Sequence, residues 1–426
     1  MVSTTIVSQE ARPASPHAWR VIAAASIGNA LEWFDLVIYA FFAVTISKLF
    51  FPSGSDTVSL LLTLGTFGVS FFMRPLGAVV LGVYADRVGR KAALTLSILL
   101  MMVGTLLIAI MPTYQSIGVL APIGIVIARM IQGFSAGGEF GSATAFLAEH
   151  GGHRRGFYSS WQAASQGLTT LLAALAGTIL TTSLTPEQVL NWGWRIPFFF
   201  GLLIGPVAYY IRTSINETPE FLTSETTQTP LADTFATQKQ RLLLAVGAVV
   251  VGTVSSYLIV YMPTYAIKQL GIPASAAFAA TIMTGVIQMI AAPIFGHLSD
   301  RFGRTGIMLT AAGIFLIFSY PLFHVLHRHP GIETLVAAQI FFGVLISAYF
   351  GVLPALLSEL FSTQTRTTGM SIGYNLSVTI FGGFAPFIIT WLIGVTGNQL
   401  APSFYLVAAA TLSFASLWGI RKLGLR

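Results

Sequence analysis

The sequence predicts an all-α membrane protein with twelve transmembrane helices, arranged as two six-helix bundles related by pseudo-symmetry. Three observations lead to this fold class. Hydrophobic residues make up 54% of the chain and charged residues only 9%, whereas soluble domains carry about 25% charged residues. Apolar runs of about 20 residues, each long enough to cross a bilayer, recur along the whole chain. One charged motif occurs twice, half a chain length apart.

The apolar runs define twelve expected helices, because a backbone in lipid must satisfy its own hydrogen bonds. The first run contains Glu32 and Asp35, which makes it a poor cleavable signal, so we expect it to remain as the first helix. The approximate bounds are 20–47, 57–83, 92–111, 117–149, 156–182, 193–212, 241–266, 273–299, 305–326, 332–361, 367–394 and 400–421.

The longest polar interval, 213–240, falls at the middle of the chain and indicates a linker between two halves. The expected organisation is therefore a cytoplasmic N-terminal segment (1–19), a first bundle (20–212), a cytoplasmic linker (213–240) and a second bundle (241–426).

Basic residues predict the orientation in the membrane. Most of the 22 Lys and Arg residues fall on the same side as the N-terminus, whereas the other side holds only Lys48, Arg195, Lys268 and Arg328. This positive-inside pattern predicts that both termini are cytoplasmic. It also explains the pI near 9.7, and because the basic residues are scattered over loops we expect no binding of nucleic acid. The chain has no cysteine, which excludes disulfides and cysteine metal sites.

The repeated motif reads GVYADRVGRK from Gly82 and GHLSDRFGRT from Gly296, in each case after the second helix of a half. A second pair of segments, 147–156 and 357–369, matches Glu149 with Glu359 at the end of a long fourth helix. Positive-inside loops would explain the arginines, but not the paired aspartates, the glycines or the shared spacing. Two parallel six-helix repeats are typical of transporters that rock one half against the other around a central site.

On these motifs the chain resembles a transporter of the major facilitator superfamily along its full length. The first motif copy is close to complete, and the second differs in ending with Thr305. The resemblance implies that charged motif residues form gates, which close the cytoplasmic side in one state and open in another without touching substrate. These residues are Asp86, Arg87, Arg90, Asp300, Arg301 and Arg304, with Glu149 and Glu359 as their partners.

Five charged residues lie deep within the expected spans, all in the first half: Glu32, Asp35, Arg74, Arg129 and Glu139. Because charges are costly in a bilayer, such residues are usually paired, face water and serve function. This asymmetry suggests that proton and anion chemistry resides in the first half.

Glu32 and Asp35 lie on one helical face, which Tyr39 continues. Two carboxylates so close repel when both are ionised, which favours proton uptake. Both are therefore candidates for proton coupling. The alternative is that one of them only neutralises an arginine of the second or fourth helix.

Arg129 opens the segment ARMIQGFSAGGEFG, with Gln132 on the same stripe, and resembles the family's Arg-x-x-Gln-Gly pattern. A guanidinium can bind a carboxylate through two hydrogen bonds. Arg129 could thus clamp an anionic substrate or pair with Asp35, and both are possible if protonation of Asp35 releases it. Glu139 lies about 15 Å further along the helix, so we expect it to pair with Arg74, whose expected role is structural or gating.

Several segments, among them GNALEWFDLVIY and WGWRIPFFFG, resemble the metabolite:proton symporter branch. GFYSSWQAASQ (156–166) looks most like the citrate and tricarballylate members. Gln162 and Gln166 share a face and could bind a carboxylate, although interhelical bonding is an equal alternative. Further candidates for substrate contact in the second half are Tyr257, Tyr261, Gln288, Tyr349, Tyr374 and Asn375.

The predicted function is import of a small citrate-like di- or tricarboxylate with protons, by alternating access, in a bacterial inner membrane. We expect no cofactor and a functional monomer in the lipid bilayer. Another organic acid, of the 2-oxoglutarate or shikimate type, or a betaine- or proline-type osmolyte stays open as substrate. The fifth helix lacks the Gly-Pro-x-x-Gly-Gly of drug:proton antiporters, and no phosphate-binding or nucleophile motif indicates an enzyme.

Overall fold

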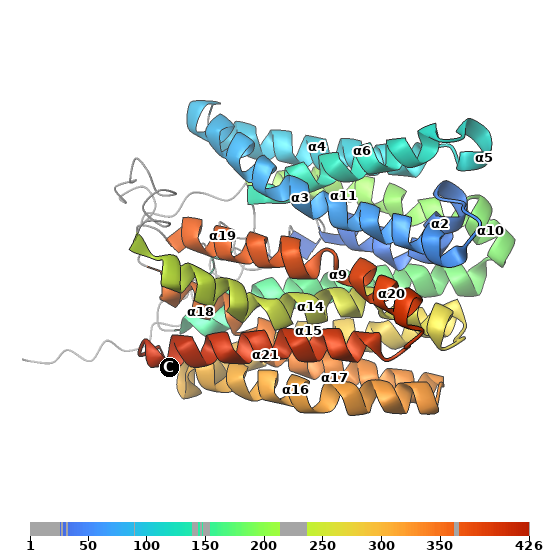
Figure 1. Cartoon of the computed structure of the whole chain (residues 1–426). Coiled ribbons are helices and arrows are strands. Elements are labelled where there is room, and N and C mark those ends of the chain that lie inside the picture. Colours follow the sequence, from blue (N-terminus) through green and yellow to red (C-terminus); the bar gives the residue numbers. More distant parts are fainter. Residues whose placement is uncertain are drawn as a thin grey trace, which may run out of the picture.

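The computed structural model describes residues 26, 29–30, 33–88, 90–138, 144, 147, 154–213, 237–361 and 366–425. Every regular element in these ranges is a helix, and the long helices run side by side along one common direction (Figure 1).

The first half contains the N-terminal helical segment Trp33–Phe41 and then α2 (Ala43–Phe50), bent 71° apart. The helices that follow are α3 (Asp56–Val88), α4 (Arg90–Ile110), α5 (Tyr114–Ile117), α6 (Leu120–Ser135) with η1 (Ala136–Gly138), α8 (Arg155–Ser159), α9 (Trp161–Ser183), α10 (Pro186–Asn191), η3 (Gly193–Arg195) and α11 (Ile196–Thr213).

The second half repeats this sequence of spans with its own set of helices. They are α14 (Lys239–Gln269), α15 (Ala274–Phe302), α16 (Arg304–Arg328), α17 (Ile332–Phe350), α18 (Leu353–Leu360), α19 (Arg366–Ser377), the π-helical η4 (Val378–Gly382), α20 (Ala385–Thr396) and α21 (Ala401–Lys422).

The twelve-helix prediction is confirmed. Among the described residues, eight helices are long and apolar enough to cross a membrane, and the bent pair at Phe42 makes a ninth. Two shorter apolar helices, Thr95–Ile110 and Leu120–Ser135, together with α11, account for the remaining spans.

Several element bounds differ from expectation. The first helix was expected as one span that ends at 47, but it turns at Phe42 and continues to Phe50. The eleventh span contains a π-helical turn, a feature that inserts one residue into an α-helix and bends it. The short α10 was not expected; it begins at a capping box in which Thr185 and Gln188 bond each other's backbone N–H.

Glycines bring α3 and α6 into backbone contact. A Cβ at Gly133 would collide with the carbonyl oxygen of Ser70, and a Cβ at Gly77 would collide with that of Phe134. This close approach, which small residues permit, is what allows polar side chains of α3, α4 and α6 to meet in the interior of the first half.

The two halves meet most extensively through α9 and α15. Glycines again permit the approach, since a Cβ at Gly167 would lie 2.6 Å from the backbone nitrogen of Met289. We call the end where α3 meets α4 and α15 meets α16 the motif end; the end of α21 also lies there, on the left of Figure 1. The other end, which carries α2, α5, α10 and the end of α20, is the opposite end.

Candidate functional site

A chain of buried hydrogen bonds joins the first helix to α4, α6 and α3, and we call it the Asp35–Arg129 network. Thr105 Oγ1 donates to Asp35 Oδ2 at 2.8 Å, and Gln132 Nε2 donates to Thr105 Oγ1 at 2.9 Å. Arg129 Nη1 donates to Gln132 Oε1 at 2.8 Å and Nη2 to Ser70 Oγ at 3.2 Å. Asp35 is 5% exposed and the other four side chains at most 1%, so the network is closed off from solvent in this conformation.

Arg129 is buried beneath aromatic rings. Its guanidinium carbon lies 4.6 Å from the ring centroid of Tyr39 and 5.1 Å from that of Phe67. Among the described residues no carboxylate forms an ion pair with Arg129 within 4.0 Å, so Arg129 reaches Asp35 only through Gln132 and Thr105. The geometry thus links the acid and the cation indirectly.

Asp35 uses only one of its two carboxyl oxygens in these bonds. Oδ1 has no hydrogen-bond partner among the described residues, and it lies against Gly201 of α11, where a Cβ would collide with it. Glu32, the expected companion of Asp35, lies outside the described residues, so the proximity of the two acids stays a prediction.

Arg74 is a second buried cation of the first half, 3% exposed. Its guanidinium carbon lies 4.6 Å from the ring centroid of Trp33 and 5.0 Å from that of Phe71. Glu139, its expected partner, lies outside the described residues. Arg74 therefore occupies an aromatic setting close to the surface where the two halves meet.

A small cavity lies between the halves. Its volume is about 40 Å³, room for about three waters at roughly 10–15 Å³ each and too little for a tricarboxylate. The walls come from the first helix, α9, α14, α15, α17 and α19, with aromatic rings, amides and hydroxyls. The lining residues are Trp33, Val37, Gln166, Thr169, Thr170, Thr253, Ser256, Tyr257, Ile259, Val260, Gln288, Phe350 and Tyr374.

Four residues singled out from the sequence line this cavity: Gln166, Tyr257, Gln288 and Tyr374. The hydroxyl of Tyr257 is buried without a hydrogen-bond partner among the described residues, and so is that of Thr253. Because an unpaired buried polar group is costly, these two hydroxyls are positions where a bound molecule would supply the missing partner.

The other predicted substrate contacts bond elsewhere in this conformation. Gln162 Nε2 donates to Asn29 Oδ1 at 3.1 Å, and Tyr39 OH donates to the Thr63 carbonyl at 3.3 Å. Tyr349 OH donates to the Ala248 carbonyl, and the hydroxyls of Tyr261 and Thr390 share a bond of 2.9 Å. Asn375 Nδ2 lies 3.4 Å from the Gly137 carbonyl of the other half. Each of these bonds holds two helices together.

Sequence reasoning missed Thr105 and Trp33. Thr105 is one of two hydroxyl residues, with Ser97, in the apolar run SILLMMVGTLLIAI of α4, and residue type alone did not distinguish it. Trp33 precedes Asp35 by two residues, which in a helix points away from the acid, so nothing in the sequence connected it to the cavity.

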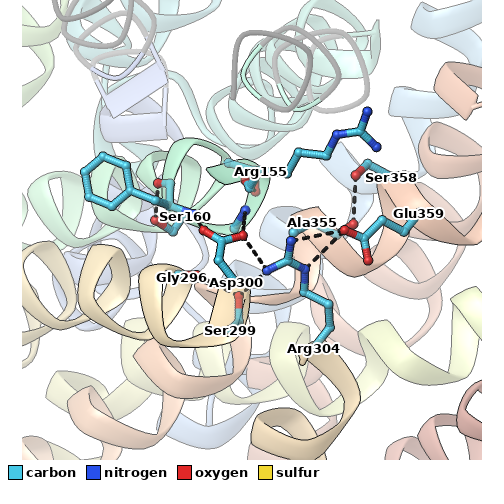
Figure 2. Close-up of polar contacts among 12 residues, drawn as sticks. Arg155, Ser160, Gly296, Ser299, Asp300, Arg304, Ala355, Ser358 and Glu359 are labelled. Atoms are coloured by element: carbon cyan, nitrogen blue, oxygen red, sulfur yellow. Dashed lines mark hydrogen bonds and ion pairs between the residues drawn. The ribbon is translucent and has the colours of Figure 1, made fainter. Parts of the chain in front are cut away.

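The motif end is closed by the second copy of the repeated motif. Asp300 Oδ1 accepts from the backbone N–H of Gly156 at 2.8 Å, and Oδ2 from that of Phe157 at 3.0 Å. These N–H groups begin α8 of the first half. Arg304 donates to Asp300 Oδ1 at 2.7 Å and to Glu359 Oε1 at 3.1 Å (Figure 2). Asp300, Arg304 and Glu359 thus form one charged cluster that fastens the two halves.

The remaining predicted gate residues take no described part in this closure. Arg301 is exposed at the end of α15. The side chains of Asp86, Arg87 and Arg90 lie outside the described residues, as does Glu149. The first copy of the motif therefore stays a prediction.

Backbone contact completes the closure at the motif end. A Cβ at Gly296 of α15 would lie 2.5 Å from the carbonyl oxygen of Gly156, and a Cβ at Gly156 would collide with the carbonyl oxygen of Gly296. The two helices can approach this closely only because both positions are glycine.

The opposite end is closed as well. Phe278 of α15 stacks on Phe41 and Phe42, at the bend of the first helix, with ring centroids 5.9 and 5.7 Å apart. Lys268 at the end of α14 forms an ion pair with Asp56 at the start of α3, with 2.8 Å between Nζ and Oδ2. With both ends closed around a small central cavity, the conformation is occluded.

The sequence and the fold match known transporters over nearly the whole chain. The model of the sugar (and other) transporter family matches residues 21–238 and 224–423. The citrate-proton symporter of Klebsiella pneumoniae is 37% identical over 92% of this chain and 88% of its own length. The proline/betaine transporter of Escherichia coli (strain K12) is 33% identical over 92% of this chain and 81% of its own length.

Among solved structures, a partially occluded, inward-open conformation of the xylose transporter XylE from E. coli superposes with a TM-score of 0.75, over 95% of this chain and 98% of that chain, at 17% identity. At this identity the likeness shows the fold alone, which is the fold of a major facilitator superfamily transporter. The chain belongs to the sugar (and other) transporter family, and it is a multi-pass membrane transporter and not an enzyme.

Proposed function

We propose that this protein imports a small citrate-like di- or tricarboxylate together with protons, by alternating access. One observation carries the proposal: a carboxyl group, Asp35, and a guanidinium, Arg129, share a buried hydrogen-bonded network in the bundle whose first helix lines the central cavity. A proton carrier and an anion binder held in one network are what coupled transport of an acid requires.

The cavity walls support an oxygen-rich substrate. The amides of Gln166 and Gln288 and the hydroxyls of Thr253 and Tyr257 offer donors from both halves. A carboxylate accepts several hydrogen bonds at once, so a molecule with several carboxyl groups could bridge the halves. The 37% identity to citrate-proton symporters of Klebsiella pneumoniae and Salmonella typhi, over nine tenths of the chain, favours the same substrate class.

Movement of the halves has to precede binding. The cavity is too small for citrate, and the guanidinium of Arg129 is covered by Tyr39 and Phe67. We infer that separation at either end widens the cavity and uncovers Arg129, so that substrate and proton exchange with one side at a time.

A second candidate is a betaine- or proline-type osmolyte. The specific observation in its favour is aromatic: Trp33, Tyr257, Phe350 and Tyr374 line the cavity, and aromatic faces attract quaternary ammonium groups. Proline/betaine transporters at 33–34% identity are also among the relatives. Such a substrate would still present its carboxylate to the same donors.

Uptake measurements in proteoliposomes distinguish these candidates. We expect radiolabelled citrate to accumulate under an imposed inward proton gradient and to equilibrate without accumulation when the gradient is collapsed. Empty liposomes are the control. Accumulation of glycine betaine and not of citrate would assign the protein to the osmolyte class. Citrate accumulation that is independent of the proton gradient would disprove proton coupling.

We further propose that the protein resides in the bacterial inner membrane as a functional monomer, with the motif end and both termini in the cytoplasm. The absence of native cysteine allows a direct test. Lys422 is exposed at the motif end and Glu333 at the opposite end. In spheroplasts, a membrane-impermeant maleimide should label Glu333→Cys at once and Lys422→Cys only after permeabilisation. The reverse order of labelling would invert the proposed topology.

A further inference from the structure

We propose that Thr105 is a positioning residue that transmits the protonation state of Asp35 to Arg129. Thr105 Oγ1 touches Asp35 on one side and Gln132 on the other, and Gln132 holds Arg129. All three contacts are buried. The proposal rests on the proposed function, because it concerns how that function couples its proton to its substrate.

The geometry makes Thr105 able to act as a relay because a hydroxyl has one hydrogen to donate and two lone pairs to accept with. While Asp35 is ionised, Thr105 donates to Oδ2 and accepts from the amide of Gln132. The carbonyl oxygen of Met101 lies 3.0 Å from the same Oγ1. It is a second acceptor already within reach.

Protonation of Asp35 reverses the first bond. A proton from solution adds to the carboxylate, and the resulting acid O–H can donate to Thr105 Oγ1. Thr105 then turns its own hydrogen to the Met101 carbonyl. Its own hydrogen now bonds a neutral carbonyl in place of a carboxylate, and its two lone pairs serve two donors, the acid O–H and the amide of Gln132, so it is a weaker acceptor for Gln132. No covalent bond other than the new O–H changes.

The effect reaches Arg129 through the amide. The nitrogen of the Gln132 amide bonds Thr105, and its oxygen accepts from Arg129 Nη1. When the bond from this nitrogen to Thr105 weakens, the amide is held less firmly in the orientation that binds the guanidinium. Arg129 is then free to exchange the Gln132 oxygen for a substrate carboxylate, so proton binding favours anion binding and the reverse.

Few other charged groups lie around Asp35 in the part of the chain that the structure describes. On α4, Thr105 donates a hydrogen bond to Asp35, and on α6, Arg129 interacts with it electrostatically. On α11, Gly201 lies against Asp35 and has no titratable group. Arg129 in turn lies within electrostatic range of Tyr39, Arg74 and Tyr257. The hydrogen-bonded path from Asp35 to Arg129 therefore runs through Thr105.

Calorimetry of citrate binding to the purified full-length protein tests the proposal. Affinity is measured from pH 6 to pH 8 for wild type, Asp35→Asn, Thr105→Val, Thr105→Ser and Thr264→Val. The titration of citrate itself affects every variant equally, so it cancels when each profile is compared with that of Asp35→Asn. Thr264 is the matched control, because its hydroxyl is fully buried and has no partner among the described residues.

Thr105→Val should bind citrate with the pH profile of Asp35→Asn, although Asp35 is still present. Thr105→Ser and Thr264→Val should keep the wild-type profile. The pH-dependent part of the wild-type affinity should amount to about 5- to 150-fold, the usual range for coupling between two sites. Gln132→Met breaks the same path one step later and should flatten the profile too, so the test does not depend on one variant folding.

Two different failures are distinguishable. In the first, the affinity of Thr105→Val and of Gln132→Met depends on pH as in wild type, whereas that of Asp35→Asn does not depend on pH. This result would overturn the relay and leave proton-coupled transport unaffected. In the second, the affinity of the wild-type protein depends on pH no more steeply than that of Asp35→Asn. This result would overturn both the proposed proton site and the relay.

Discussion

Asp35→Asn is expected to abolish accumulation of citrate against its gradient while leaving exchange of citrate across the membrane. Asparagine keeps the size of the side chain and can still accept from Thr105, but it cannot take up a proton. With an inward gradient of one pH unit, wild type should accumulate substrate about tenfold for each coupled proton, because one pH unit is worth about 1.4 kcal/mol. The variant should only reach equal concentrations on both sides.

An assay of citrate exchange separates a defect in proton coupling from a defect in citrate binding or movement of the halves. When labelled citrate outside replaces unlabelled citrate inside, the transporter can shuttle loaded in both directions and need not release its proton. We therefore expect counterflow in Asp35→Asn to persist at a rate close to that of wild type. Glu333→Gln is the matched control, since Glu333 is an exposed carboxylate at the opposite end, and it should accumulate citrate like wild type.

The two assays together decide the role of Asp35. Loss of both accumulation and counterflow would mean that Asp35 is needed for the structure of the network and does not act as the proton carrier. Retained accumulation would move the proton site elsewhere, with Glu32 as the next candidate.

The sequence was sufficient for the fold because the bilayer imposes strong rules on composition. A span needs about 20 apolar residues, and the twelve runs found on this basis correspond to the helices of the structure. The repeat also picked out Asp300, Arg304 and Glu359, which lie in one cluster at the motif end; their role as a gate stays a prediction. Charged residues in so apolar a chain are few, so each of them carries information.

Serine and threonine residues were much less useful than charged residues for predicting the site. Serine and threonine in these helices often bond a carbonyl three or four residues earlier in their own helix, as Thr178 and Ser255 do. The type of residue therefore does not distinguish Thr105, which joins Asp35 to Gln132, from a threonine that only satisfies itself. That distinction depends on which helices pack together, and α4 meets α6 through packing that no local pattern predicts.

The bend of the first helix could also not be predicted from the sequence. Kinks usually arise at proline or at pairs of small residues, and the segment IYAFFAVT around Phe42 has neither proline nor glycine. The bend coincides with the stacking of Phe41 and Phe42 on Phe278 of the other half. We infer that this tertiary contact, and not the local residues, holds the first helix in its bent form.

Gly296→Ala is expected to prevent closure of the motif end. The added Cβ would lie 2.5 Å from the backbone oxygen of Gly156 and from Ser160 Cβ, and a backbone atom cannot turn aside as a flexible side chain can. Overpacking of this kind costs about 1–3 kcal/mol, which lowers the population of the closed state about 5- to 150-fold. Gradient-driven uptake should fall in the same proportion, because every cycle passes through this state.

Distance measurements separate an open protein from a misfolded one. The chain has no native cysteine, so spin labels can be placed at Arg154→Cys and Phe302→Cys, two exposed positions on the facing ends of α8 and α15. In Gly296→Ala their separation should shift to the longer distances of an open motif end. Gly306→Ala is the control, because a Cβ there meets nothing within 4 Å.

The hydrogen bonds from α8 to Asp300 alone should not be able to keep the motif end closed in this variant. Asp300 reaches the N–H groups of Gly156 and Phe157 at 2.8 and 3.0 Å only while α8 and α15 are in backbone contact, and hydrogen bonds weaken steeply once the atoms move beyond about 3.5 Å. Separating the glycines therefore also breaks the charged contact between the halves. If the labels in Gly296→Ala stay at the wild-type distance while uptake is lost, closure does not depend on the glycine contact, and the charged cluster of Asp300, Arg304 and Glu359 holds the halves by itself.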